Sequence, residues 1–465
     1  MRVHVPVVPV PVRVEGVNSS FIRMNFFERI FDRQQRNTLS PPVQGLYHFN
    51  WYQGDQKSRL HLRIDEDGSG LLMVNANRVI HLNPTAVCMA YYSLNRTPTL
   101  KAIQQISDHL KVPENLITRD YAQYTQDLNN LLDDQVCPVC DLELETTLPF
   151  SSRPSAPYRM DLAITYRCNN ACSHCYNARS RDFPELDTST WKKILDRLWD
   201  LRIPHVVFTG GEPTIREDLP ELIKHAENNG QITGLNTNGR KLSDPRYMEA
   251  LVEAGLDHVQ VTFESHVPEI HDLMVCHKGA FTETVEGIRN ALNTRLFVMT
   301  NTTMLTHNKH TIPQTIEYLA NLGVPTVGLN ALIYSGRGKT VGTGLKETEL
   351  HELLESAQKI TFTNNQKLIW YTPTQYCNFD PVQAGFGIKG CTAALYNMCL
   401  EPDGGVLPCQ SYYQPLGNIL NDSWDTIWNH ELSTSLRERN ILPEKCSGCL
   451  IRNECGGGCP LIQDI

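Results

Sequence analysis

Apolar residues along this chain change their spacing near residue 160. From there, short apolar runs alternate with segments of helical periodicity, in the order DLAITY (161–166), HVVFTG (205–210), ITGLNT (232–237), HVQVTFE (258–264), LFVMTNT (296–302) and TVGLNALI (326–333). This alternation predicts an α/β fold with parallel strands joined by crossover helices, and six units are too few for a closed eight-stranded barrel. One helical stripe, predicted to pack on the sheet, carries Trp191, Ile194, Leu195, Leu198 and Leu201 in the segment 188–201.

The part before residue 160 has a different pattern. Short strand-like runs, LHLRID, GLLMVN and RVIHL, surround the turn sequences DEDGSG and NAN, and helical stretches follow near 84–95, 98–110 and 119–133. Strands followed by helices predict a small α+β, winged-helix-like domain over residues 46–135. Residues 1–45 form an N-terminal extension in this interpretation, and the proline-rich, acidic stretch 136–157 is a linker.

Composition narrows the class of protein. The chain has 465 residues, of which 41% are hydrophobic and 20% charged, and its net charge of −9 argues against a nucleic-acid partner. No run approaches the ~18 apolar residues of a membrane helix, so we expect a cytoplasmic protein without a membrane partner. The fifteen cysteines are tightly clustered, which favours metal or cluster ligation over disulfides. Cys137 and Cys140 of the linker have no matching pair of cysteines nearby. They are either exposed or packed thiols, or they belong to a metal site or a redox pair.

Two motifs carry the chemistry. Cys168, Cys172 and Cys175 lie in CNNACSHC directly after the first strand, and Gly210, Gly211 and Glu212 end the second strand in GGEP. Thiolates suit iron–sulfur clusters, and three of them would leave one iron of a four-iron cluster open. A structural zinc site is the alternative, but zinc normally takes four protein ligands.

Together these motifs resemble the radical S-adenosylmethionine (SAM) superfamily. The resemblance implies a partial (β/α)6 TIM-like barrel, a [4Fe-4S] cluster on the cysteine triad, SAM on its open iron, and an electron donor such as flavodoxin or ferredoxin. Reductive cleavage of SAM would then give a 5′-deoxyadenosyl radical. Expected cofactor contacts are His174 at the adenine position, Tyr176, Gly210, Gly211 and Glu212, the last accepting from the SAM ammonium group.

The order of the strands adds further candidate residues at the same end of the predicted barrel. Asn236 and Asn238 end the third strand, Thr262 and Glu264 lie on the fourth, and Asn301 ends the fifth. In relatives the segment matching HDLMVCHKGAF usually carries an arginine near the SAM carboxylate, whereas this chain has His277 and Lys278. Cys276 lies in the same segment, either as a buried unreactive thiol or facing the pocket.

A second cysteine region follows residue 370. It reads CSGCLIRNECGGGC at 446–459, with the spacing C-x2-C-x5-C-x3-C, preceded by Cys391 and by a G-x4-C that ends at Cys409. This spacing resembles the SPASM extension of radical SAM enzymes, which carries auxiliary iron–sulfur clusters; a zinc ribbon is the alternative. The resemblance implies a near set of Cys391, Cys409 and Cys459 and an outer set of Cys446, Cys449 and Cys455. Each set lacks one ligand, so one or two auxiliary clusters are expected. Cys377 or Cys399 completes the near set, while the outer cluster uses Asp464, keeps an open iron or is lost.

The front domain resembles the peptide chaperone of pyrroloquinoline-quinone biosynthesis, through Arg63, Gly68–Gly70, Leu82-Asn83 and TLKAIQQI. An uncommitted winged helix is the alternative. The resemblance implies that an edge strand including Val79–His81, together with helix 119–133, binds the leader of a precursor peptide by strand addition.

This domain order, with a barrel at 158–370 and a SPASM-like domain at 371–465, is typical of a radical SAM peptide maturase that installs a crosslink or related modification. The alternatives are the same chemistry on a protein side chain, as in sulfatase maturases, or on a small cofactor precursor. A non-catalytic iron–sulfur or zinc scaffold is a further alternative.

Overall fold

The computed structural model of the chain describes residues 41–53, 56–74, 78–132 and 154–462. The described helices and strands all belong to one compact unit, Pro42–Ile465. Most of the expected extension and linker, with Cys137, Cys140 and Asp464, lies outside the described residues. Within them, no helix is long and apolar enough to cross a membrane.

The front part contains a four-stranded antiparallel sheet in the order β1-β2-β3-β4. Its strands are β1 (Gly45–Gln53), β2 (Gln56–Ile64), β3 (Gly70–Val74) and β4 (Arg78–Leu82). Three helices follow: α2 (Pro84–Leu94), α3 (Thr99–Leu110) and α4 (Glu114–Leu132). Asn83 starts α2, because its side chain accepts from the Ala86 N–H at 2.9 Å and Pro84 occupies the first turn. Strand β1 was missing from the sequence prediction, and α4 begins earlier than predicted.

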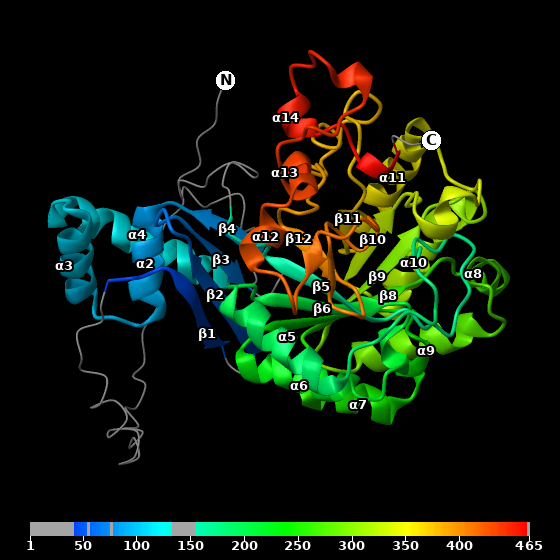
Figure 1. Ribbon diagram of the computed structural model, residues 1–465, viewed down its shortest axis with the longest axis horizontal. Coiled ribbons are helices and arrows are strands. Elements are labelled where there is room, and N and C mark those ends of the chain that lie inside the picture. Colours follow the sequence, from blue (N-terminus) through cyan, green and yellow to red (C-terminus); the bar gives the residue numbers. More distant parts are fainter. Residues whose placement is uncertain (1–40, 54–55, 75–77, 133–153, 463–465) are drawn as a thin grey trace, which may run out of the picture. The chain divides into compact units, whose positions relative to one another are not determined.

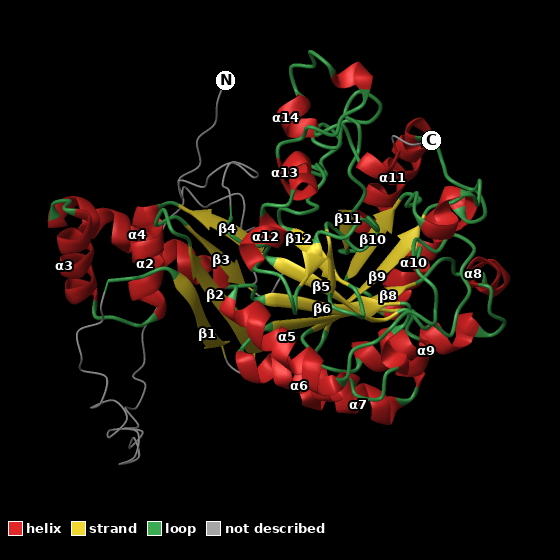
Figure 2. Ribbon diagram, viewed as in Figure 1, coloured by secondary structure: helices red, strands yellow, loops and turns green. Residues whose placement is uncertain are grey.

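The second sheet contains all six predicted parallel strands. They are β5 (Arg159–Thr165), β6 (His205–Gly210), β7 (Ile232–Thr237), β8 (His258–Thr262), β9 (Phe297–Thr303) and β10 (Thr326–Asn330). Each pairs in parallel with the next, so the chain winds in one direction (Figures 1 and 2). The connecting helices are α5 (Thr188–Asp200), α6 (Leu219–Asn229), α7 (Pro245–Ala254), α8 (Pro268–Val275), α9 (Ala280–Leu292) and α10 (Ile312–Leu322).

Later segments extend this sheet at both ends. Helix α11 (Glu347–Thr363) leads to β11 (Lys367–Trp370), which pairs in parallel with β10. At the other end β12 (Asn397–Leu400) pairs in parallel with β5, followed by β13 (Gly405–Leu407) and β14 (Gly417–Asn418). Among the described residues the sheet runs from β11 to β14 without closing, which confirms the open α/β fold. Three short helices complete the cysteine-rich part: α12 (Trp424–Trp428), α13 (Glu431–Arg437) and α14 (Arg452–Cys455).

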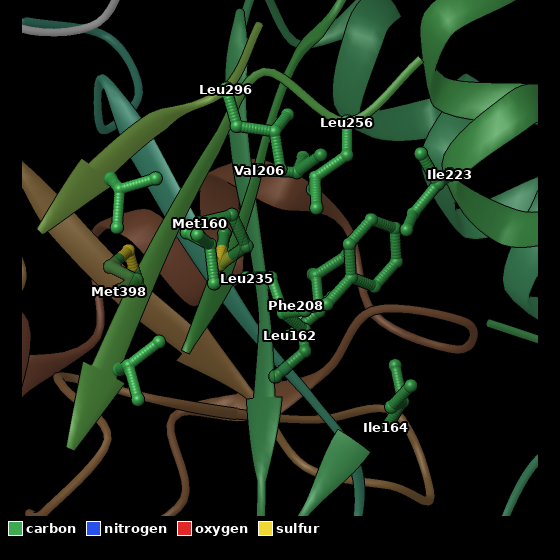
Figure 3. Close-up of a cluster of buried hydrophobic side chains, with 14 of the residues drawn as sticks. Met160, Leu162, Ile164, Val206, Phe208, Ile223, Leu235, Leu256, Leu296 and Met398 are labelled. Carbon is green, nitrogen blue, oxygen red and sulfur yellow. The ribbon is translucent and has the colours of Figure 1, made fainter. Parts of the chain in front are cut away.

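The main hydrophobic core lies between the sheet and its helices. Alternate strand residues point outward and pack there, among them Met160, Leu162, Ile164, Val206 and Phe208 (Figure 3). The predicted helix stripe is confirmed, since α5 buries Trp191, Ile194, Leu195 and Leu198. The residues between these outward positions face the inside of the sheet, where the candidate site lies.

Candidate radical SAM active site

The inner face of the second sheet borders a cavity of about 1980 Å³. Strand β8 shows how alternation builds its wall, because His258, Gln260 and Thr262 line the cavity while Val259 and Val261 join the core. Of the predicted SAM-site residues, all but Glu212 line it: Cys168, Cys172, His174, Cys175, Tyr176, Gly210, Gly211, Asn236, Asn238, Thr262, Glu264 and Asn301. The structure therefore brings together side chains that the sequence spreads over more than a hundred residues.

The triad loop after β5 is fixed by backbone bonds to the end of α8. The N–H groups of Ala171 and Ser173 donate to the carbonyls of Val275 and Met274, at 3.1 and 3.0 Å. Burial raises the pKa of the Cys168 thiol to about 11 and that of Cys172 well above its usual value. Metal binding needs thiolates, so loading this site releases protons.

Three guanidinium groups surround the same loop, and sequence reasoning missed them. They donate to backbone carbonyls of the loop: Arg181 to Cys168 at 2.8 Å, Arg240 to Asn169 at 2.7 Å and Arg337 to Ala171 at 2.7 Å. Arg240 also lies 2.8 Å from Nε2 of His277, in the segment that departs from the family pattern. A guanidinium group is thus present beside His277 although that segment contains no arginine.

Gly210 and Gly211 bring the end of β6 against the end of β5. The Gly211 N–H donates to the carbonyl of Thr165 at 2.7 Å, and the Glu212 N–H donates to that of Arg167 at 2.9 Å. Gly210 has a φ of 134°. Its absent side chain allows a backbone approach that other residues would block.

Glu212 lies behind the cavity wall. Oε1 accepts from the N–H and hydroxyl of Thr214 and from the hydroxyl of Thr237, at 3.1, 2.7 and 2.7 Å, and Oε2 accepts from the Asn238 N–H at 2.7 Å. Burial raises the pKa of Glu212, and these bonds act against that shift. Glu212 therefore ties the ends of β6 and β7 together; its predicted contact with the SAM ammonium stays a prediction.

Replacing Glu212 with Gln tests this bracing role. Both carboxylate oxygens accept from donors, so an amide N–H₂ would face a donor in either orientation and cost about 1–3 kcal/mol. We expect thermal unfolding at a lower temperature and weaker SAM binding. Glu221→Gln, which changes an exposed carboxylate paired with Lys192, is the matched control and should unfold like the parent. An unchanged melting temperature for Glu212→Gln would contradict the bracing role.

His174, predicted to contact the adenine of SAM, is paired with Glu264. Its Nε2 lies 3.0 Å from Oε1 of Glu264, whose Oε2 accepts from the Thr303 N–H at 2.9 Å. Within the described residues, Nδ1 of His174 is buried without a hydrogen-bond partner, as are Oδ1 of Asn301 and of Asn330. Buried polar atoms are rarely left unpaired, so these three atoms in the cavity wall suit a bound polar ligand.

The site contains residues that the sequence prediction omitted. Asn330 ends β10 as Asn301 lies on β9, so the rule that found Asn301 would have found it too. Arg159, His205 and His258 line the cavity from the first positions of their strands. Nε2 of His205 lies 2.8 Å from Nε2 of His258; burial lowers both pKa values, that of His258 to about 4. This imidazole pair is therefore neutral near pH 7.

The auxiliary cysteines form two groups. The near set, Cys391, Cys409 and Cys459, lines the same cavity as the triad. Burial raises all three pKa values, that of Cys409 to about 12, and thiols of this set raise the pKa of Cys409 and Cys459 further. The three thiols therefore border one cavity, and their binding of a single cluster stays a prediction.

The two candidates for a fourth near ligand lie elsewhere. Cys377 does not line the cavity, and the Tyr376 N–H next to it lies 3.4 Å from Sγ of Cys455 in the outer set. Cys399 is 1% exposed and packs in an apolar cluster with Ala163 and Tyr166. That Cys377 or Cys399 completes the near set stays a prediction; sequence position alone could not show which set the loop before residue 380 approaches.

Comparisons with known proteins match this architecture. A model of the radical SAM superfamily matches residues 162–330, and a model of the iron–sulfur cluster-binding SPASM domain matches residues 391–450. A PqqA peptide cyclase from Bradyrhizobium diazoefficiens is 30% identical over 316 residues, covering 65% of this chain and 81% of that protein. This chain belongs to the radical SAM superfamily. It is a radical SAM enzyme with a SPASM domain, and its cofactors are SAM, a [4Fe-4S] cluster and auxiliary iron–sulfur clusters.

Two solved structures share the fold. Streptococcus suis SuiB bound to precursor peptide SuiA has a TM-score of 0.66 at 15% identity, covering 86% of this chain and 94% of that one. Native anSMEcpe with bound AdoMet has a TM-score of 0.53 at 18% identity, covering 65% of this chain and 89% of that one. At these identities the likeness shows the fold.

The donor set fits the cofactors of this superfamily. All cysteines of the triad and of both auxiliary sets are free thiols, and the triad faces the cavity. Among the described residues, no three His, Cys, Asp or Glu side chains are gathered closely enough to hold one metal ion. A cluster presents a different iron to each thiolate, so its ligands need not converge on one point.

Proposed function

We propose that this radical SAM enzyme modifies a ribosomally made peptide whose leader binds the front domain. The main support for this proposal is that the triad, the near set, and Met73 and His81 of the front sheet all line one cavity. The proposed functional units are residues 46–135, 158–370 and 371–465. A reducing cytoplasm suits the clusters, and a flavodoxin or ferredoxin is the proposed electron donor.

The front sheet contacts the barrel through a polar face of β2. Arg59, His61 and Arg63 alternate along the strand and are all buried. Arg59 donates to the carbonyl of Gln231 at 2.9 Å, and Nε2 of His61 lies 2.7 Å from the carbonyl oxygen of Gly230. Buried polar contacts need fixed geometry, so this face sets where the front sheet meets the barrel.

Strand β4 supplies the peptide-binding edge in this proposal. It is the last strand of its sheet, so one side of its backbone has no strand partner among the described residues. The ring of His81 on β4 lies 5.9 Å from that of Tyr158 and 6.0 Å from that of Tyr396, both of which line the cavity. A peptide added to β4 would therefore continue toward the triad.

The cavity also suits a reaction that removes two hydrogen atoms. When bound, SAM and its cluster would supply a radical that takes one hydrogen atom from the substrate; the auxiliary clusters would accept one further electron while one proton leaves to solvent, so that two hydrogen atoms are lost in all. This chain contributes the enclosure, because the triad and the near set line one cavity. SuiB, whose structure was solved with a precursor peptide, covers 86% of this chain, which supports a peptide as substrate.

Mass spectrometry tests this function. Reduced, reconstituted enzyme is incubated with SAM and each short peptide encoded beside its gene. We expect one peptide to lose two hydrogen atoms and to give no fragments between the joined residues. A side-chain oxidation would also lose two hydrogens but would fragment normally, and peptides that stay unmodified while 5′-deoxyadenosine accumulates would count against the proposal.

Single prolines at Ile80 and His81 test the peptide-binding edge. Successive N–H groups of a strand point to opposite sides, so one proline disrupts the pairing of β4 with β3 and the other removes a donor from the free edge. We expect one variant to melt earlier and the other to keep its melting temperature while binding a fluorescein-labelled leader peptide ~10-fold more weakly, about 1.4 kcal/mol. Unchanged affinity in both variants would refute strand addition here.

A further inference from the structure

The loop before residue 380 contacts the outer cysteine set. The Tyr376 N–H lies 3.4 Å from Sγ of Cys455, and that thiol lies 3.8 Å from the carbonyl oxygen of Thr374. Cys377 is the next residue along this loop, and its side chain is exposed. The loop thus places Cys377 one residue from a backbone contact with Cys455, which closes α14.

Contacts on its other side hold the loop in place. The side-chain amide of Asn378 donates to Glu347 of α11 at 2.7 Å, and the N–H groups of Asn378 and Phe379 donate to the carbonyl of Gln375 at 2.9 and 3.1 Å. Phe379 is buried in the main core. Cys377 is therefore held at this position by neighbours on both sides.

Backbone geometry groups the outer thiols. Cys446 ends a short 3-10 helix (Glu444–Cys446), the Cys449 N–H donates to the carbonyl of Cys446 at 3.1 Å, and Cys455 closes α14 shortly afterwards. The loop that carries Cys377 therefore approaches a short segment that holds the other three thiols. The triad and near set line the cavity instead, and Cys377 does not.

We propose that Cys377 is the fourth ligand of the outer auxiliary cluster, together with Cys446, Cys449 and Cys455. Four thiolates are the full complement of a [4Fe-4S] cluster. Cys377 precedes the SPASM match at residues 391–450, so the ligand comes from outside the segment that the family model covers. The near set keeps three cysteines, because Cys399 is buried among apolar residues. This assignment does not depend on which substrate the enzyme modifies.

Thiol footprinting of the unaltered protein tests the assignment. Cys276, Cys377 and Cys449 are all exposed, so iodoacetamide should alkylate all three in the cluster-free protein. After anaerobic reconstitution we expect Cys377 and Cys449 to be protected together, whereas Cys276 stays reactive. Alkylation of Cys377 in protein whose Cys449 is protected would overturn the proposal.

Variants give a second, independent measurement. Cys377→Ala leaves three thiolates at the outer cluster, as at the triad, so we expect a changed electron paramagnetic resonance signal for that cluster and unchanged signals for the others. Cys446→Ala likewise leaves three thiolates and should keep its iron, whereas combining the two substitutions leaves two thiolates and should remove about four irons. Cys276→Ala should keep the iron content and the signals of the parent. A parent-like outer signal in Cys377→Ala, or loss of about four irons in Cys446→Ala alone, would overturn the assignment.

Discussion

Replacing Cys168, Cys172 and Cys175 together with Ala should abolish 5′-deoxyadenosine formation and remove about four irons from each chain. The three thiols lie on one loop and face the cavity, and this loop contains no fourth cysteine. Iron and sulfide analysis after anaerobic reconstitution, with chromatographic detection of 5′-deoxyadenosine after reduction, measures both effects. The iron of the auxiliary clusters should remain, since their cysteines lie in other segments.

Cys276→Ser is the matched control for the triad. Cys276 directly follows Val275, whose carbonyl accepts from the triad loop, yet its own thiol is exposed. This variant should keep its iron and its 5′-deoxyadenosine formation. Cleavage of SAM by the triple variant would show that the triad does not hold the reactive cluster.

Much of the barrel was predictable because each strand carries apolar residues that pack against the helices. The strands lie in largely apolar runs of six to eight residues, and β5 to β10 begin and end within three residues of those runs. The cysteine triad and the two glycines of GGEP could be predicted equally well, because their chemistry depends on local spacing in the sequence. Local patterns therefore located the strand ends where the cofactor chemistry occurs.

The features that could not be predicted depend on contacts between distant segments. Pairing of β12 with β5 joins residues more than two hundred positions apart. Arg159, His205 and His258 occupy the first positions of strands, whereas the sequence prediction took its site residues from the other ends of the strands; the inner face nevertheless collects all of them in one cavity. Strand β1 was missed because its residues show no clear alternation of buried and exposed positions.

Glu212 shows how a motif can be identified correctly while the contacts of one side chain differ from expectation. GGEP indicated a cofactor site, and both glycines line the cavity. The carboxylate, however, accepts from Thr214, Thr237 and Asn238, and two of these donors lie on or just after a strand distant in sequence. The sequence contains no information on which side of the backbone those donors approach.

Gly211→Ala should weaken SAM binding by ~10-fold to ~100-fold. A Cβ at this position would lie 2.2 Å from the carbonyl oxygen of Arg167 and 2.6 Å from that of Tyr166. Both are backbone atoms, so the ends of β5 and β6 must separate and lose the bonds between them. Overpacking of this kind costs about 1–3 kcal/mol, and each 1.4 kcal/mol is a factor of ten in affinity. Equilibrium dialysis with reconstituted protein measures the change.

Gly323→Ala separates this steric effect from a general cost of adding a methyl group. Gly323 caps α10 with a φ of 91°, and no described atom beyond its chain neighbours lies within 4 Å of the position that a Cβ would occupy. Its replacement should lower the melting temperature through backbone strain while SAM affinity stays that of the parent, because α10 ends away from the triad loop. Gly211 has no such φ, so its effect must come from contact with the Tyr166 and Arg167 carbonyls. Equal SAM affinity in both variants would show that close approach of β5 and β6 is not what shapes the cofactor site.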